Sequence, residues 1–192
     1  MTDLSKSEKE IYDLRKQKVA EIKSSSIDSY ATFVENSTPI SSIIEAHDSL
    51  EEGEQTEIAA LIRGRLINIR SFGKLTFMDV KDYSGKIQLL ISKDSLSDEL
   101  NNYVSNLDVG DIVSAKGTVM KTKKGELSLK LETISLLSKS LRAFPEKWHG
   151  LKDKETRFRQ RYLDLLVNED AMNAISMPVS YTHLTLPTIL RV

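Results

Sequence analysis

The chain has 192 residues, of which 40% are hydrophobic and 29% charged, and its formal net charge is −1. This length fits one domain with extensions or two small domains, and the composition is that of an ordinary globular protein. No run of about 18 apolar residues is present and the charged N-terminus is unlike a secretory signal, so we expect a cytoplasmic protein without a membrane segment. The lack of cysteine excludes disulfides and thiol nucleophiles, and three scattered histidines predict no metal site.

Charge is unevenly distributed along the chain. Residues 1–57 contain 6 Lys/Arg and 13 Asp/Glu, whereas residues 116–161 contain 13 Lys/Arg and 5 Asp/Glu. A basic block of this kind indicates either a surface that contacts nucleic acid or an ordinary solvated face. The charge pattern alone leaves both interpretations open.

Helical spacing of apolar residues, together with capping signals, predicts four helices. They are expected at 4–24, just after Pro39, at 95–106 and near 155–167. Ser95 and Asp98 resemble a capping box, so we expect them to open the third of these helices.

Five segments rich in apolar residues predict strands in the remaining sequence. They lie at 57–70, 75–81, 86–92, 112–121 and from Leu127 onward. Gly64 marks a place where the first strand can bend or bulge. In the second strand Thr76, Met78 and Val80 form the more apolar face, which puts Phe77 on the solvent side.

Five strands with a helix between the third and the fourth predict a mainly β fold, a five-stranded Greek-key barrel of the OB type. An SH3-like or generic β-sandwich domain is the alternative. The expected organisation is an N-terminal helical extension, the barrel, a basic helical connection and a C-terminal tail. These regions are placed at 1–56, 57–137, 138–177 and 178–192.

The tail differs from the rest of the chain. Residues 179–188 read VSYTHLTLPT, which continues no preceding pattern. The segment resembles one translated frame of a transposon-derived adapter used in DNA sequencing libraries. We therefore expect the reading frame to be cut short near Met177, with a C-terminal part of the natural protein missing, and we take no site residue from 178–192. The other interpretation is a genuine C-terminal strand.

Catalytic patterns are missing from the sequence. It contains no Gly-rich phosphate loop and no Ser/His/Asp order, and Asp82 is better explained as a turn residue than as the partner of Asp79 in a catalytic pair. We therefore predict no catalytic residue in this chain.

Binding residues are easier to place, because OB barrels commonly present strands two and three to single-stranded nucleic acid. Phe77 offers a ring for base stacking, and Arg70 and Gln88 offer groups that read base edges. Glu126 could accept a base N–H, and phosphate contacts are predicted for Lys121, Lys123 and Lys124. In the alternative interpretation Phe77 is a core aromatic residue, and Arg70 and Gln88 are solvated strand residues.

Two stretches resemble a known family. Residues 149–165, HGLKDKETRFRQRYLDL, and the hairpin KTKKGELS are similar to the N-terminal part of bacterial-type class II lysyl-tRNA synthetases. The similarity runs from about residue 8 to residue 176. Aspartyl and asparaginyl enzymes share the OB domain and an RYLDL-like segment, but the two stretches favour the lysyl family.

The resemblance implies an anticodon-binding domain. Phe77 would stack on the central uracil of the tRNA(Lys) anticodon, Arg70 and Gln88 would read its edge, and Glu126 would contact a neighbouring base. The N-terminal helix would lie along the anticodon stem. The arginines of the connection would meet the catalytic domain and subunit interface or form structural ion pairs; they are Arg157, Arg159 and Arg161.

The resemblance also implies a longer enzyme, a homodimer that uses ATP and Mg²⁺ to attach lysine to tRNA. Residues 138–177 would be a linker and the truncated start of the class II catalytic domain. The chain stops before the catalytic motifs of that family, so alone it should be inactive and bind no cofactor. Two other functions stay open. The chain could be a free-standing OB protein that binds single-stranded nucleic acid, or a fragment of an aspartyl- or asparaginyl-tRNA synthetase.

Overall fold

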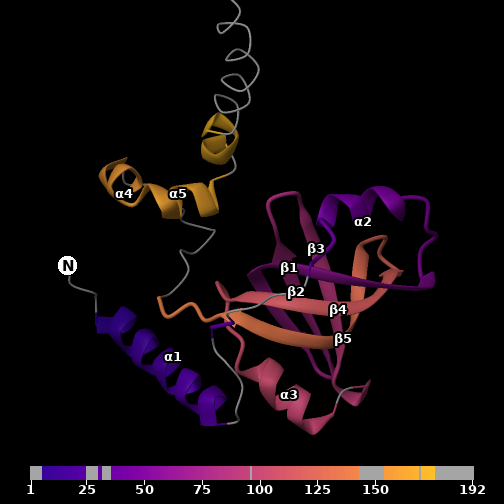
Figure 1. Ribbon diagram of the computed structural model, residues 1–192, viewed down its shortest axis with the longest axis horizontal. Coiled ribbons are helices and arrows are strands. Elements are labelled where there is room, and N and C mark those ends of the chain that lie inside the picture. The colour runs from indigo at the N-terminus through magenta and orange to yellow at the C-terminus, as the bar shows by residue number, and fades with distance from the viewer. Residues whose placement is uncertain are drawn as a thin grey trace, which may run out of the picture. The chain divides into compact units, whose positions relative to one another are not determined.

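The computed structural model describes residues 6–24, 30–31, 36–95, 97–142, 154–168 and 170–175. The chain divides into two compact units, Met1–Ala143 and Phe144–Val192, which are described separately. The first unit contains all five described strands and the second contains short helices (Figure 1). The predicted mainly β architecture, with helices before and after the strands, is confirmed.

The five strands close on themselves in the order β1-β2-β3-β5-β4, which is the closed barrel of an OB fold. Neighbours are antiparallel except β3 and β5, which run parallel. The closed order excludes the alternative of two stacked sheets. The strands are β1 Gln55–Phe72, β2 Leu75–Lys81, β3 Lys86–Ser92, β4 Ile112–Lys121 and β5 Leu127–Ser138.

The long first strand serves two neighbours, because its first half pairs with β4 and its second half with β2. At Gly64 a Cβ atom would lie 2.6 Å from the Lys81 carbonyl oxygen, so only glycine fits this close approach. The register of β1 against β2 shifts between Leu66 and Asn68. The predicted irregularity is therefore real, but the close approach and the bulge occur at different residues.

Helices flank the barrel. They are α1 Lys6–Ser24, α2 Ile40–Ala46 and α3 Asp98–Ser105, and a 3₁₀ turn covers Lys93–Ser95. The expectation that Ser95 opens the third helix is wrong. Ser97 is the N-cap, and its Oγ accepts a hydrogen bond from the Leu100 amide at 3.3 Å.

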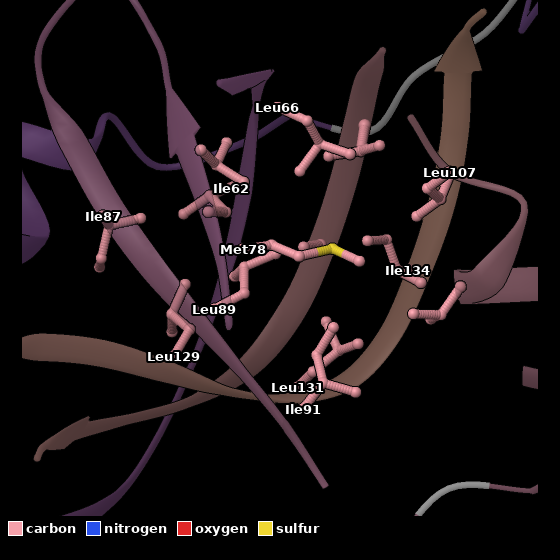
Figure 2. Packing of buried hydrophobic residues seen from close by; sticks show 14 of the residues in the cluster. Ile62, Leu66, Met78, Ile87, Leu89, Ile91, Leu107, Leu129, Leu131 and Ile134 are labelled. Atoms are coloured by element: carbon pink, nitrogen blue, oxygen red, sulfur yellow. The ribbon is translucent and has the colours of Figure 1, made fainter. Parts of the chain in front are cut away.

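The barrel interior is a single apolar cluster (Figure 2). Met78 and Val80 of β2 lie fully inside it, together with Ile62 and Leu89 from the neighbouring strands. The predicted inner face of β2 is confirmed. Phe77, on the opposite face, is outside this core and half-buried.

Hydrogen bonds from a guanidinium, together with an ion pair, attach α1 to the barrel. The Arg15 guanidinium donates to the carbonyl oxygens of Ser140 and Arg142 at 2.8 and 2.7 Å. Lys18 Nζ donates to Asp108 Oδ1 at 2.8 Å. On the same helix Ile22 is buried in the core cluster. Arg15, Lys18 and Ile22 lie on one side of α1, and through them the helix contacts the loop before β4 and the segment after β5.

Asp108 makes the stability of this attachment depend on pH. Burial alone raises the pKa of Asp108, but hydrogen bonds from Lys139 and Lys18 outweigh it and hold the pKa below its ordinary value. A carboxylate with a lowered folded-state pKa stabilises the fold above its unfolded value, about 3.9, and this stability is lost as pH falls through the folded value.

We expect Asp108→Asn to lower the free energy of unfolding at pH 7 by about 1.5–3 kcal/mol, the range for hydrogen bonds to charged groups. The difference from the unsubstituted chain should shrink as pH falls below about 4. Urea unfolding at pH 7 and pH 3 measures both values. Asp94→Asn, which alters an exposed pair with Lys74, is the control. A difference of equal size at both pH values would contradict the ionic origin.

In the second unit, one helix predicted near 155–167 is split in two, α4 Lys154–Arg159 and α5 Arg161–Val167. The break is at Gln160, whose φ of −117° and ψ of 54° are not helical. Arg157 and Arg161 both bind the Asp164 carboxylate, and these contacts lower its pKa. Two of the three arginines of the connection thus form structural ion pairs around a buried carboxylate.

Some expectations concern residues outside the described ranges. The segment 143–153, most of the HGLKDKE stretch and the whole adapter-like tail belong to this group. Among the helices that are described, none has both the length and the apolar composition that crossing a lipid bilayer requires.

Candidate nucleic-acid interface

The outer surface of β1, β2, β3 and β5 carries the predicted binding residues, and we call this surface the outer face. Strand register sets its first row, because Asn68 pairs with Asp79, Asp79 with Gln88, and Gln88 with Ser128. The strand neighbours of Asp79 and of Gln88 are buried in the core, as period-two alternation requires. Four polar side chains therefore lie in line across four strands.

A second row lies two residues along the strands. Arg70 pairs with Phe77, Phe77 with Leu90, and Leu90 with Lys130. The half-buried Phe77 ring thus lies between a guanidinium on one side and an exposed lysine further across the sheet. Proteins that bind single-stranded nucleic acid combine an aromatic ring, on which a base stacks, with flanking cations that contact phosphates.

Hydrogen bonds fix the Gln88 side chain. Its Nε2 donates to Glu126 Oε2 at 2.9 Å, and its Oε1 accepts from Ser128 Oγ at 3.2 Å. A carboxylate can only accept, so the contact with Glu126 determines which end of the amide is nitrogen. Gln88 is 8% exposed and is not a solvated strand residue. One amide N–H and one oxygen lone pair remain for a ligand.

Asp79 organises the other half of the outer face. Its Oδ1 accepts from Arg70 Nη2 at 3.3 Å, and its Oδ2 accepts from Asn68 Nδ2 at 3.3 Å. Asp79 is buried, whereas the Arg70 side chain stays partly exposed. The guanidinium is therefore oriented by a buried carboxylate, and its remaining N–H groups are available for a base edge or a phosphate.

Asp79 and Asp82 do not form a pair. Asp82 accepts from the Ser84 and Gly85 amides at 2.7 and 2.8 Å and from the Ile40 amide at 3.0 Å. Burial raises the pKa of Asp82, but these hydrogen bonds outweigh it and lower the pKa. Its position in the β2–β3 turn agrees with the predicted turn chemistry.

The basic hairpin between β4 and β5 places its lysines differently. Lys123 and Lys124 are exposed at the turn, where Gly125 has a φ of +79°. Lys121 Nζ donates to the carbonyl oxygens of Leu50 and Asp48 at 2.8 and 3.4 Å. Lys121 therefore holds the segment after α2, whereas the other two lysines extend into solvent.

The structure brings together four of the predicted residues, Arg70, Phe77, Gln88 and Glu126, on the outer face. Sequence reasoning did not identify the residues that orient them. The sequence pattern raises Asp79 only as a possible partner of Asp82, does not single out Ser128, and places Lys130 within the basic block. It does not single out Phe72 either, whose ring centroid lies 6.1 Å from that of Phe77. Strand register was the missing information.

The chemistry of the outer face is that of recognition. It offers a ring, a guanidinium, an amide and a carboxylate, which match the face and the edges of a base. Within the described ranges, no group of three or more His, Cys, Asp or Glu side chains could hold a metal ion.

Comparison with known proteins agrees with this chemistry. Residues 60–137 match a tRNA anticodon family model described as an OB-fold nucleic acid binding domain. The lysine–tRNA ligase of Oceanobacillus iheyensis is 43% identical over 160 residues, covering 82% of this chain and 32% of the relative. That of Dehalococcoides mccartyi is 45% identical over 157 residues, covering 81% and 31%. That of Thioalkalivibrio sulfidiphilus is 50% identical over 116 residues, covering 60% and 23%.

The closed barrel and the family match together define residues 60–137 as an OB-fold nucleic-acid-binding domain. The resemblance noted from the sequence is confirmed, because the chain is similar to lysine–tRNA ligases over about four fifths of its own length. It spans about a third of the length of the curated relatives it matches.

Proposed function

We propose that this chain binds the anticodon stem-loop of tRNA(Lys) through the outer face of its OB domain. The observation that carries the proposal is the convergence of Arg70, Phe77, Gln88 and Glu126 on one surface, with Gln88 joined to Glu126 and Arg70 paired in register with Phe77. The similarity to lysine–tRNA ligases supports tRNA(Lys) over the tRNAs of aspartyl and asparaginyl enzymes.

Each residue of this set has a chemical role in the proposal. Phe77 stacks on the central uracil, while Arg70 and Gln88 bind its edge. Uracil carries both an N–H donor and carbonyl acceptors, which the free N–H and lone pair of Gln88 complement. Glu126 contacts a neighbouring base through its carboxylate.

Phosphate contacts come from Lys123 and Lys124, which extend from the hairpin. Lys121 contributes only the N–H left over from its two carbonyl partners. The N-terminal helix α1 contributes by lying along the anticodon stem.

Catalysis is proposed to belong to the longer enzyme and not to this chain alone. That enzyme would be a cytoplasmic class II lysine–tRNA ligase and a homodimer, and it would use ATP and Mg²⁺ to attach lysine to tRNA. The chain by itself is expected to bind no cofactor and to have no ligase activity.

Phe77→Ala tests the proposal. It should weaken binding to a stem-loop with a UUU anticodon by about 1–3 kcal/mol, the contribution of one stacked base. Phe77→Leu, which keeps an apolar side chain but removes the ring, should lose a similar amount. Fluorescence anisotropy with a labelled stem-loop at fixed salt measures both.

A stem-loop with a changed central base is the control for specificity. The unsubstituted chain should bind it more weakly, and Phe77→Ala should reduce that difference. Equal, strongly salt-dependent binding to both loops would leave only a basic surface and would favour a free-standing single-strand-binding protein. Unchanged affinity in a folded Phe77→Ala chain would overturn the stacking role.

A further inference from the structure

The outer face continues beyond Phe77 into an apolar third row at the β1–β2 turn. Phe72 pairs with Leu75, and Leu75 pairs with Ser92. The two apolar side chains are 66% and 39% exposed, although they belong to strands of a folded barrel. A single exposed apolar residue needs no explanation, but this pair adjoins the proposed binding residues.

Phe72 and Phe77 form one aromatic surface. Their ring centroids are 6.1 Å apart and their planes are inclined by 66°. Two bases that each stack on one ring would share this inclination and could not lie parallel. Proteins that recognise single-stranded RNA hold bases splayed apart in this manner.

Charge around the pair favours nucleic acid over an apolar protein partner. Arg70 lies one row away along β1, and Lys74 lies in the turn between Phe72 and Leu75. Lys74 is 77% exposed and its partner Asp94 is 63% exposed, so their contact is weak and exchangeable. Aromatic rings interleaved with cations are characteristic of single-stranded nucleic-acid surfaces.

We propose that Phe72 is a second base-stacking residue, which takes the base next to the one held on Phe77. This inference rests on the proposed function and extends it from one recognised base to two adjacent ones. The only other role the geometry allows is indirect, with Phe72 supporting the Phe77 ring from its edge. The two roles differ in whether the effect of Phe72 depends on a neighbouring base.

The experiment compares the full chain and its Phe72→Ala variant on three stem-loops. One has a UUU anticodon, and each of the other two has an abasic site in place of one neighbour of the central uracil. Phe72→Trp tests rescue by another aromatic ring. Tyr83→Ala removes an exposed ring at the β2–β3 turn, at the other end of the same strands, and is the matched control.

Phe72→Ala should weaken binding to the UUU loop about 5-fold or more, from the lower limit for one stacked base. On one of the two abasic loops the Phe72→Ala and unsubstituted chains should bind equally, whereas Phe77→Ala still weakens binding. Phe72→Trp should bind the UUU loop as the unsubstituted chain does, and Tyr83→Ala should change nothing.

Other outcomes overturn the proposal in separate ways. Equal weakening by Phe72→Ala on all three loops would assign Phe72 to support of Phe77. No weakening on any loop would remove it from the interface. The proposed function itself is tested separately, with the stem-loop that has a changed central base. If the unsubstituted chain bound that loop and the UUU loop equally, the proposed function would be overturned.

Discussion

Replacing Lys139 by methionine should lower the free energy of unfolding by about 3–5 kcal/mol, the range for breaking a buried ion pair from one side. The Lys139 side chain is fully buried, and its Nζ lies 2.7 Å from both Asp108 Oδ2 and Asp111 Oδ2. Asp111 is itself fully buried. Methionine fills a similar volume, so the loss would come from two carboxylates without their shared cation.

Urea unfolding followed by circular dichroism measures this change. Lys74→Met is the matched control, because Lys74 forms an exposed pair with Asp94 and exposed pairs contribute about 0–1 kcal/mol. If Lys139→Met were as stable as Lys74→Met, the buried cluster would contribute nothing to folding and the account of α1 attachment would have to change.

Ile62→Ala should destabilise the barrel by about 2–5 kcal/mol, the usual cost of truncating a buried aliphatic side chain to alanine. Ile62 is 0% exposed and lies in the apolar cluster inside the barrel (Figure 2). Its backbone pairs with Ala115 of β4, and both residues belong to the core cluster. Because Ala115 is small, truncating Ile62 should leave a cavity that the neighbouring side chains fill only in part.

Ile58→Ala provides the comparison on the same strand, with the same change of side chain. Ile58 is 56% exposed, so its truncation should change stability by less than about 0.5 kcal/mol. The two variants differ only in burial. Similar losses for both would mean that strand propensity, and not the core, determines the stability of β1.

The sequence predicted the strands and their faces well because alternation is a local signal. Met78 and Val80 lie in the core and Phe77 lies outside it, as the pattern in that strand predicts. Local signals also have limits. Two serines precede the third helix, and only the structure shows that Ser97, not Ser95, has its Oγ at the Leu100 amide.

The candidate site was predictable only in part, because register is a long-range property. Gln88 and Ser128 are forty positions apart in the sequence, and only the pairing of β3 with β5 places their side chains in contact. Asp79 likewise gains its importance from the Arg70 and Asn68 side chains on the adjacent strand. No local pattern distinguishes such a carboxylate from one that is simply solvated.

The parallel contact between β3 and β5 has a consequence for how this domain can change. Three residue pairs join these strands, whereas seven join β2 to β3. The side chains of Gln88 and Ser128 are hydrogen-bonded across this short pairing, and Gln88 is also proposed to contact the RNA. We therefore expect a substitution of Gln88 that changes the proposed base contact to weaken the closure of the barrel as well, so that a new specificity would need a compensating gain in stability.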